Sequence, residues 1–300
     1  MSQGFKEAGL DVIMGIDHWD KATDSYQANQ KHMTLCADLR HVDPASLELP
    51  EVDILVGGPP CQGFSMAGKR ESNDPRNSLF MEYVRFLDYF NPKTFIMENV
   101  MGILSMKTEN NESCIKIITD HLGRNYNYIV CKLYASDFGV PQNRRRVIII
   151  GIRKDLNILP TEPIPLTTPR PAVSTIIQPR QDVDASHFLS DRAITGINAK
   201  KERSKAKGHG FGAQFLNMDK PSYTISARYW KDGSDALVKY DDTNIRRLTI
   251  LELKRIQSFP DDYVLCGSKK DQIMQIGNAV ACKFAKCIGE HIISLLQSSI

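Results

Sequence analysis

The residue best suited to nucleophilic chemistry is Cys61, in the segment DILVGGPPCQGFS over residues 53–65. The apolar run Ile54–Val56 predicts a buried strand, and two prolines fix the backbone that leads from it to the thiol. The end of such a strand is the edge of an α/β sheet at which ligands bind. A core cysteine rarely lies between a proline pair and a polar loop, so the segment favours Cys61 as a nucleophile over a structural thiol.

A second polar group closes the segment FIMENV, residues 95–100, where Glu98 and Asn99 end an apolar strand. We expect both side chains to lie at the same edge of the sheet as Cys61. A partly desolvated carboxyl group there suits an acid that donates a proton to a substrate. A plain turn at the end of the strand is the alternative.

A third group lies in VPQNRRRVIIIG, residues 140–151, where Gln142 and three arginines precede an apolar strand. Side chains alternate along an extended segment, so Arg144 and Arg146 point to one side and Arg145 to the other. A run of arginines is usually a solvated face. The alternation nevertheless lets Arg144 and Arg146 enter one site together.

The elements that position these groups alternate between short apolar runs and segments with helical spacing, which predicts βαβ units and a parallel, doubly wound α/β sheet. The predicted strands are Val12–Ile16, Ile54–Val56, Thr94–Met97 and Val147–Ile152, and the predicted helices are Gly4–Ala8, Lys21–Gln30, Ser78–Phe90 and Ser113–Leu122. From about residue 155 the sequence becomes proline-rich and then basic, which indicates a second, irregular domain. Helical patterns resume at residues 249–257 and 279–296.

The composition is that of a soluble globular protein, with 300 residues of which 42% are hydrophobic and 24% charged. It excludes disorder and collagen-like repeats, and the length suggests roughly two domains. No apolar stretch approaches the ~20 residues of a membrane span, and no signal peptide is visible.

The spacing of the cysteines and the distribution of charge along the chain further limit the possible functions. The seven cysteines are scattered without a CxxC pair or a histidine cluster, so we expect no metal site, no disulfide framework and a reducing, cytoplasmic setting. The net charge is −6 over residues 1–140, +9 over residues 141–260 and 0 over the remainder. The middle of the chain is therefore the candidate for binding a polyanion.

Five blocks in order, GGPPCQGFS, MENV, QNRRR, RRLTILELKRIQSFPDDY and QIGNAV, resemble the motifs of the bacterial C5-cytosine-specific DNA methyltransferase family. The resemblance implies a Rossmann-like S-adenosylmethionine-dependent methyltransferase fold with a smaller, irregular target-recognition domain. We expect residues 1–155 plus 265–300 to form the catalytic and cofactor-binding domain. Residues 156–264 are then the target-recognition domain and hinge.

The same resemblance implies transfer of a methyl group from S-adenosylmethionine to C5 of a cytosine flipped out of duplex DNA. The protein is then a monomer and either the modification half of a restriction–modification system, whose cognate endonuclease acts separately, or a solitary relative of such enzymes. By the family pattern, Cys61 adds to cytosine C6 as a thiolate, and Glu98 holds or protonates N3. Arg146 contacts the cytosine O2, and Arg144 supports the catalytic loop and the surroundings of Cys61.

For the cofactor, the resemblance assigns Asp17 to the ribose hydroxyls and Asp38 to the adenine amino group. Either Trp19 or His18 is the neighbour of the adenine. The rest of the expected pocket is Leu39, Pro60, Leu79, Asn278 and Val280. Ordinary core packing is the alternative for Trp19 and Leu79.

For DNA, the basic run at residues 200–207 predicts phosphate contacts by Lys201, Lys205 and Lys207, with a solvated loop as the alternative. The segment PSYTISARYWKDGSDA, residues 221–236, resembles the core of a recognition domain. It offers base or phosphate contacts, for which the candidates are Thr224, Arg228, Tyr229 and Lys231.

One departure from the family concerns the start of the chain. The family opens with a strand and a glycine loop that contains a phenylalanine, whereas this sequence begins at the helix expected after that loop. One alternative is therefore an N-terminally truncated, catalytically inactive remnant that still binds DNA. Another is a tRNA methyltransferase of a related branch, which the long recognition segment and the absence of a Cys-Phe-Thr signature disfavour.

Overall fold

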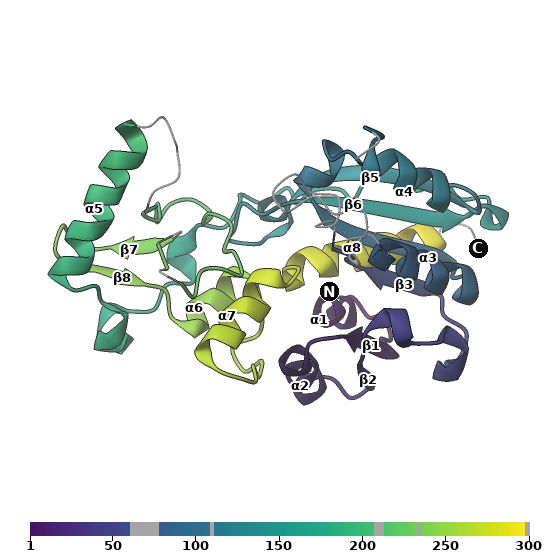
Figure 1. The fold of residues 1–300 in the computed structure, drawn as a ribbon, viewed down its shortest axis with the longest axis horizontal. Coiled ribbons are helices and arrows are strands. Elements are labelled where there is room, and N and C mark those ends of the chain that lie inside the picture. Colours follow the sequence, from purple (N-terminus) through teal and green to yellow (C-terminus); the bar gives the residue numbers. More distant parts are fainter. Residues whose placement is uncertain (61–77, 109–110, 207–212, 232, 235, 298–300) are drawn as a thin grey trace.

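The computed structural model describes residues 1–60, 78–108, 111–206, 213–231, 233–234 and 236–297. Its described parts form two lobes joined side by side (Figure 1). The larger lobe contains the main sheet with helices on both faces. The smaller lobe contains a short hairpin and a long peripheral helix.

Within the described residues the main sheet has four strands in the order β3-β4-β6-β5. These are β3 (Ile54–Gly57), β4 (Thr94–Val100), β5 (Tyr126–Tyr134) and β6 (Arg145–Arg153). Strands β3 and β4 are parallel, but β6 runs antiparallel to both of its neighbours. The expectation of a wholly parallel sheet is therefore wrong, because only a short 3-10 helix, Ala135–Phe138, and a loop join β5 to β6. Without a crossover helix the chain turns straight back.

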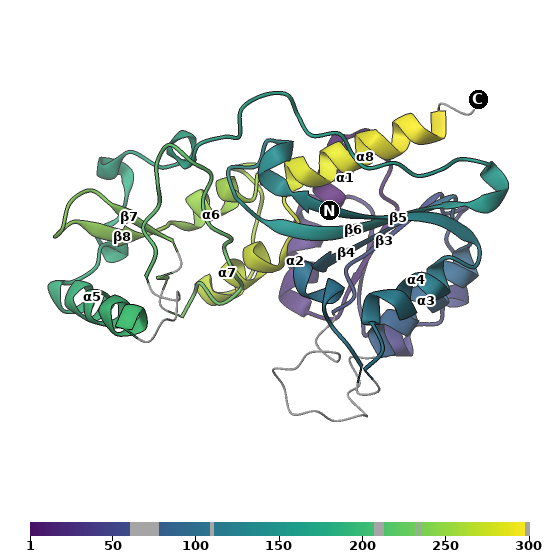
Figure 2. The ribbon, with the colours of Figure 1, turned by 90° about the horizontal axis from the view of Figure 1, so that it is seen from above.

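Helices cover both faces of this sheet (Figure 2), as in a doubly wound fold. Helices α1 (Ser2–Glu7) and α8 (Cys282–Gln297) lie on one face, and α3 (Ser78–Phe90) and α4 (Cys114–Leu122) on the other. Alternate residues of the strands serve the two cores. Ile148 and Ile150 pack with the α8 side chains, whereas Phe95 and Ile149 pack with those of α3 and α4.

Strands β1 (Met14–Asp17) and β2 (Met33–Cys36) form a separate parallel pair, with α2 (Asp20–Asn29) between them in sequence. Among the described residues β1 pairs only with β2, and β3 pairs only with β4. Each of these two strands therefore has one edge without a ladder partner. The helix α1 approaches α8 closely, since a Cβ on Gly4 would lie 2.2 Å from the carbonyl oxygen of Cys282.

The smaller lobe has its own core. It contains α5 (Asp191–Ala206), β7 (Leu237–Lys239), β8 (Ile245–Arg247), α6 (Ile250–Ile256) and α7 (Lys269–Asn278). The side chains of α6 and α7 pack around Ile225, Tyr229 and Val238. No helix in the described parts of the chain is long and apolar enough to cross a membrane.

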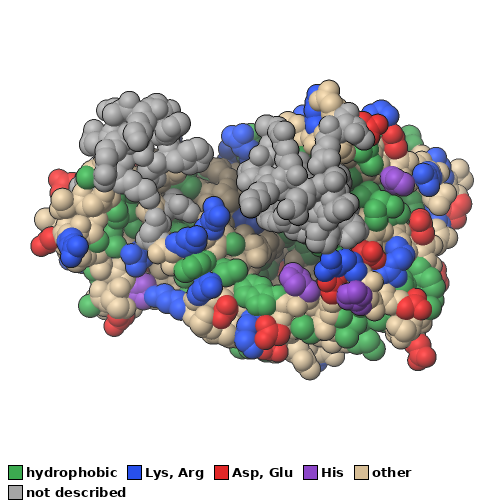
Figure 3. All heavy atoms as spheres, in the orientation of Figure 1, with side chains coloured by type: hydrophobic (Ala, Val, Ile, Leu, Met, Phe, Trp, Pro, Cys, Tyr) green, Lys and Arg blue, Asp and Glu red, His purple; other side chains and the backbone are tan. Residues whose placement is uncertain are grey.

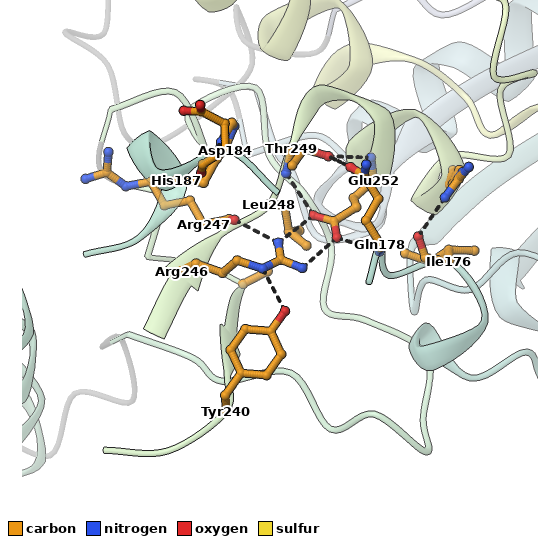
Figure 4. A network of polar contacts seen from close by, with 12 residues as sticks. Ile176, Gln178, Asp184, His187, Tyr240, Arg246, Arg247, Leu248, Thr249 and Glu252 are labelled. Atoms are coloured by element: carbon orange, nitrogen blue, oxygen red, sulfur yellow. Dashed lines mark hydrogen bonds and ion pairs between the residues drawn. The ribbon is translucent and has the colours of Figure 1, made fainter. Parts of the chain in front are cut away.

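A buried ion pair joins β8 to α6 (Figure 4). Arg246 and Glu252 are both 0% exposed, and the guanidinium donates to the carboxylate through two bonds of 2.8 Å. Glu252 also accepts from the backbone nitrogens of Thr249 and Gln178, and the Tyr240 hydroxyl accepts from Arg246 Nε. Every charge in the pair is thus compensated, which is the condition under which burial of an ion pair is tolerated.

Candidate active site

The carboxyl ends of β3 and β4 meet at one edge of the sheet, as the sequence predicts. Asn99 Nδ2 donates to the carbonyl oxygen of Pro59 at 3.0 Å. A Cβ on Gly58 would lie 3.2 Å from Glu98 Oε2. The segment that leads toward Cys61 therefore runs beside Glu98, while Cys61 itself lies outside the described residues.

Glu98 forms an ion pair with Arg146 across strands β4 and β6. In the antiparallel ladder Arg146 lies opposite Val100, which places it diagonally from Glu98 on the same face. Arg146 Nε is 2.5 Å from Glu98 Oε1, and the two side chains are only 12% and 15% exposed. The sheet therefore brings together two of the catalytic residues that the sequence predicts.

Arg144 points inward like Arg146, whereas Arg145 is exposed and lies 4.8 Å from the centre of the Tyr134 ring. Arg144 is 4% exposed and donates to the carbonyl oxygens of Ile225 and Gly277 at 3.2 and 2.8 Å. Its described bonds thus reach the recognition segment and the end of α7. Burial, with a further contribution from Arg146, lowers the pKa of Arg144 to about 9.

Two buried amides that sequence reasoning gave no role hold the same segment. Gln142 Oε1 accepts from the backbone nitrogen of Ile225 at 3.0 Å, and Gln142 Nε2 donates to Gln257 Oε1 at 3.1 Å. Gln257 Nε2 donates in turn to the carbonyl oxygen of Ile276 at 2.8 Å. We call Gln142 and Arg144 the main-chain clamp, because together they bind both peptide groups of Ile225. In the sequence, the only sign of a role for Gln257 is that its amide side chain lies next to the apolar side of the predicted helix 249–257, at the end of that helix.

The first cofactor candidates lie at the ends of the smaller strand pair. Asp17 ends β1, its side chain is 53% exposed, and its Oδ1 accepts from the backbone nitrogen of Trp19 at 2.9 Å. Trp19 is half-buried, while His18 is exposed. Asp38 precedes the 3-10 turn Leu39–His41 and pairs with Arg40, which holds the pKa of this carboxyl well below its usual range.

The other cofactor candidates differ in their exposure. Leu39 and Leu79 are half-buried, Pro60 and Asn278 are exposed, and Val280 is 8% exposed within the core beneath α8. Asn278 ends α7. Among the described residues the hydrogen bonds and ion pairs of Asp17 and Asp38 go to Trp19, His18 and Arg40, and none goes to Asn278. The exposed Asp17 and Asn278 and the half-buried Asp38 suit the polar ribose and adenine groups of a nucleoside, whereas the Val280 side chain serves the core.

The predicted DNA contacts are placed as follows. Lys201 and Lys205 lie one turn apart on α5, but their side chains, and Lys207 entirely, lie outside the described residues. Thr224 and Arg228 are exposed, and Thr224 Oγ1 donates to the carbonyl oxygen of Asn143 at 3.0 Å. The expectation that Tyr229 contacts DNA is wrong for its side chain, which is 3% exposed and packs in the core of the smaller lobe.

Comparison with known proteins then decides the family. The model of the C-5 cytosine-specific DNA methylase family matches residues 1–294. The chain belongs to this family. It is 36% identical to the type II methyltransferase M.SsoII of Shigella sonnei, over 98% of this chain and 77% of that protein. It is 34% identical to M.NlaX of Neisseria lactamica, over 98% of this chain and 93% of that protein.

Solved structures agree with the methylase fold. A DNMT2 variant from Spodoptera frugiperda is 22% identical, covers 99% of this chain and 96% of its own, and superposes with a TM-score of 0.74. At this identity the likeness shows the fold alone. As a C5-cytosine DNA methylase the protein is an enzyme that uses S-adenosylmethionine as cosubstrate. Within its described residues, no group of three or more histidine, cysteine and acidic side chains could hold a metal ion.

Proposed function

We propose that this methylase transfers a methyl group to C5 of a cytosine that is flipped out of a specific duplex DNA site, as the modification enzyme of a restriction–modification system. The observation that carries the proposal is the Glu98–Arg146 pair at the sheet edge, beside the backbone that leads to Cys61. A flipped base is the geometry that lets such groups reach the ring, because a stacked and paired cytosine hides its reactive face.

Cys61 supplies the covalent step. Cytosine C5 is a poor nucleophile, so the Cys61 thiolate adds to C6 and makes C5 electron-rich. C5 then attacks the methyl group of S-adenosylmethionine, the bond between that methyl group and the sulfonium sulfur breaks, and the neutral thioether S-adenosylhomocysteine leaves. Transfer of the C5 proton to a base and cleavage of the bond between Cys61 and C6 then release 5-methylcytosine and the free thiolate.

Glu98 and Arg146 act on the ring itself, and Arg144 supports the catalytic loop and the surroundings of Cys61. In this proposal the Glu98 carboxyl group holds or protonates N3 while charge develops on the ring, and Arg146 donates to O2. The Nε atom of Arg144 is buried without a hydrogen-bond acceptor among the described residues, whereas that of Arg146 faces Glu98 Oε1 at 2.5 Å. Because a guanidinium group has five N–H donors, Arg146 can hold Glu98 through Nε and still donate to a base carbonyl.

The cosubstrate is assigned to the exposed polar groups at the strand ends. Asp17 binds the ribose hydroxyls, Asp38 accepts from the adenine amino group, and Asn278 lies at the flank. The half-buried Trp19 and Leu39 pack beside the adenine. In this structure Arg40 donates hydrogen bonds to both oxygens of the Asp38 carboxylate. The adenine amino group must therefore displace Arg40 or donate to the lone pairs that Arg40 leaves unused.

Replacement of Cys61 tests the covalent step. Cys61→Ser should abolish methyl transfer and leave DNA binding intact, because a hydroxyl group is a far poorer nucleophile at neutral pH than a thiolate. On duplex DNA containing 5-fluorocytosine the wild-type protein should form a covalent adduct that gel electrophoresis detects, and Cys61→Ser should form none. Cys36→Ser, which changes an exposed thiol on β2, is the matched control and should still be trapped.

The outcomes separate the alternatives. An adduct with Cys61→Ser would overturn the assignment of the nucleophile. Wild-type protein that binds duplex DNA but neither traps nor methylates it would support the inactive DNA-binding remnant instead. Bisulfite sequencing of host DNA with and without the gene reports the target site. Gel filtration tests our further proposal that the enzyme is a monomer and that its endonuclease acts separately.

A further inference from the structure

An arginine on α3 binds the backbone of the turn that carries Asp38. The 3-10 helix Leu39–His41 begins after Asp38 and ends before Val42, and we call residues 38–42 the Asp38 turn. Arg85 Nη2 donates to the carbonyl oxygens of Leu39 and Val42 at 2.7 and 2.9 Å. Carbonyl groups at the end of a helix need donors from outside it. Arg85 supplies such donors, so α3 holds the carboxyl end of the Asp38 turn.

A carboxylate on α3 itself holds this guanidinium group in place. Glu82 Oε2 accepts from Arg85 Nε at 2.8 Å and lies 2.7 Å from Arg85 Nη2. Basic, acidic and histidine side chains are mixed on the face of the larger lobe between α3 and the β1–β2 pair (Figure 3). An exposed ion pair within one helix contributes little to stability. The specific consequence of this pair is that it orients Arg85 toward the Asp38 turn.

The other end of the Asp38 turn is held by Asp38 itself. Asp38 Oδ1 accepts from the backbone nitrogen of Arg40 at 3.0 Å, and both carboxylate oxygens accept from the Arg40 side chain. An amino group that binds this carboxylate therefore competes with the Arg40 side chain. The bonds from Arg85 go to main-chain carbonyl groups, so they do not depend on where the Arg40 side chain lies. They can keep the turn in place while Arg40 moves.

We propose that Arg85 is a positioning residue for the cosubstrate, which fixes the Asp38 turn so that the Asp38 carboxylate meets the adenine amino group. The proposal rests on the proposed function, which assigns Asp38 to that amino group. The same helix carries Leu79, another residue of the proposed pocket, so Arg85 joins two of the elements that enclose the adenine. A hydrogen bond weakens steeply when its donor and acceptor shift or tilt. Loss of the bonds from Arg85 should therefore weaken recognition of the amino group.

The test compares two ligands that differ at the group that Asp38 binds. S-adenosylhomocysteine carries the adenine amino group, and S-inosylhomocysteine carries an oxygen in its place. In isothermal titration the wild-type protein should bind the adenosine compound about tenfold more tightly, the ratio expected for one hydrogen bond to a charged acceptor. In Arg85→Gln this preference should fall toward equal affinity, because the carboxylate is no longer held in position.

Steady-state kinetics should show the same division. Arg85→Gln should raise the KM for S-adenosylmethionine more than it lowers kcat, and should leave the KM for DNA unchanged, because Arg85 contacts none of the reacting atoms. Arg85→Lys should recover part of the preference for the adenosine compound. Its ammonium group can donate to the same carbonyl oxygens, but it lacks the planar fork that also holds Glu82.

The matched control is Arg153→Gln at the end of β6. Like Arg85, Arg153 pairs with an acid close to it in the sequence, Asp155, and donates to a main-chain carbonyl oxygen, that of Asn91. Its loss should lower the thermal stability to a similar extent as Arg85→Gln. It should leave the preference for the adenosine compound unchanged, because Arg153 has no bond to the Asp38 turn.

Each outcome bears on one level of the proposal. A wild-type preference that persists in Arg85→Gln, or an equal loss of preference in Arg153→Gln, would overturn the role of Arg85. Equal affinity of the wild-type protein for both ligands would reject the assignment of Asp38 to the adenine and the role of Arg85 with it, while methyl incorporation by that protein would still support the transfer reaction. Wild-type protein that binds neither ligand and does not methylate DNA would reject the proposed function and this role together.

Discussion

At the scale of single residues, the Glu98–Arg146 pair was partly predictable. Alternation along the arginine block correctly predicts that Arg144 and Arg146 share a side and that Arg145 does not. It does not reveal that Arg146 meets Glu98, because that contact depends on the antiparallel register between β4 and β6. The pairing of Asp38 with Arg40 was missed for a similar reason, since it needs the 3-10 turn that brings the two side chains together.

The Glu98–Arg146 pair should behave as a coupled unit. Glu98→Gln and Arg146→Gln should each lower the free energy of unfolding, because each leaves a mostly buried charge without its partner. The double variant should lose less than the sum, with a coupling energy of about 1–3 kcal/mol. Urea unfolding of the four proteins measures this, and additive losses would show that the two side chains are energetically independent. We expect methyl transfer to be lost in all three variants.

At the scale of elements, the predicted strands β3, β4 and β6 are confirmed, since each has a continuous apolar run, which is buried in β4 and β6 and half-buried in β3. Strand β5 was missed, since its sequence YNYIVCKLY mixes polar and apolar residues and its burial does not follow a strict alternation. Helices α5 and α7 were also missed. Their sequences, DRAITGINAKKERSKA and KKDQIMQIGN, carry many polar residues, so no broad apolar stripe indicates a helix.

The end of α7 should tolerate only glycine at position 277. A Cβ there would lie 2.4 Å from the backbone nitrogen of Ala227, so Gly277→Ala must push the recognition segment away from the helix. We expect a loss of about 1–3 kcal/mol in the free energy of unfolding, although alanine is the better helix former. Gly196→Ala on α5 is the control, because nothing lies within 4 Å of its Cβ, and it should be neutral or stabilising. Equal effects of the two substitutions in thermal unfolding would contradict this packing.

The turn between β7 and β8 should be acid-sensitive. Asp241 accepts from the backbone nitrogens of Thr243 and Asn244 and from both side chains, and these bonds lower its pKa from 3.8 to about 2. The unfolded state binds the proton more readily, so the carboxylate stabilises the turn fully above about pH 4, and this contribution disappears as the pH falls through about 2. The difference in stability between wild type and Asp241→Ala should therefore shrink over that window in an acid titration. A constant difference would mean that the bonds do not depend on the charge.

At the scale of the whole molecule, the change in composition near residue 155 indicated a second domain, and the structure shows a second lobe. The proposed boundary at residue 265 assigned α7 to the catalytic part, yet Ile273 and Ile276 pack in the core of the smaller lobe with Ile225 and Leu253. Sequence spacing shows that a helix has an apolar side but not which core receives it. The local sequence pattern therefore does not reveal which lobe a helix belongs to or where the hinge between the lobes lies.

The edges of β1 and β3 that lack a ladder partner among the described residues should be detectable by amide hydrogen exchange. Strands β4 and β6 have a partner on each side and core residues such as Phe95 and Ile150 that are 0% exposed, whereas the described β1 and β3 each have one partner. We expect amides of β1 and β3 to exchange faster than those of β4 and β6, since unpaired edges open at lower free energy. Uniform protection across all four strands would show that both edges are paired in solution.

The main-chain clamp has a consequence for how this protein can change over evolutionary time. Gln142 and Arg144 bind the nitrogen and the oxygen of the Ile225 peptide groups, and Arg144 also binds the Gly277 carbonyl, so the clamp holds the recognition segment and the end of α7 by their backbone atoms. Backbone atoms are common to all sequences. A neighbouring exposed position such as Arg228, which takes no part in the clamp, is thus free to diversify without loosening the joint between the lobes. Target preference can drift, or be exchanged with a relative, while the catalytic half stays as it is.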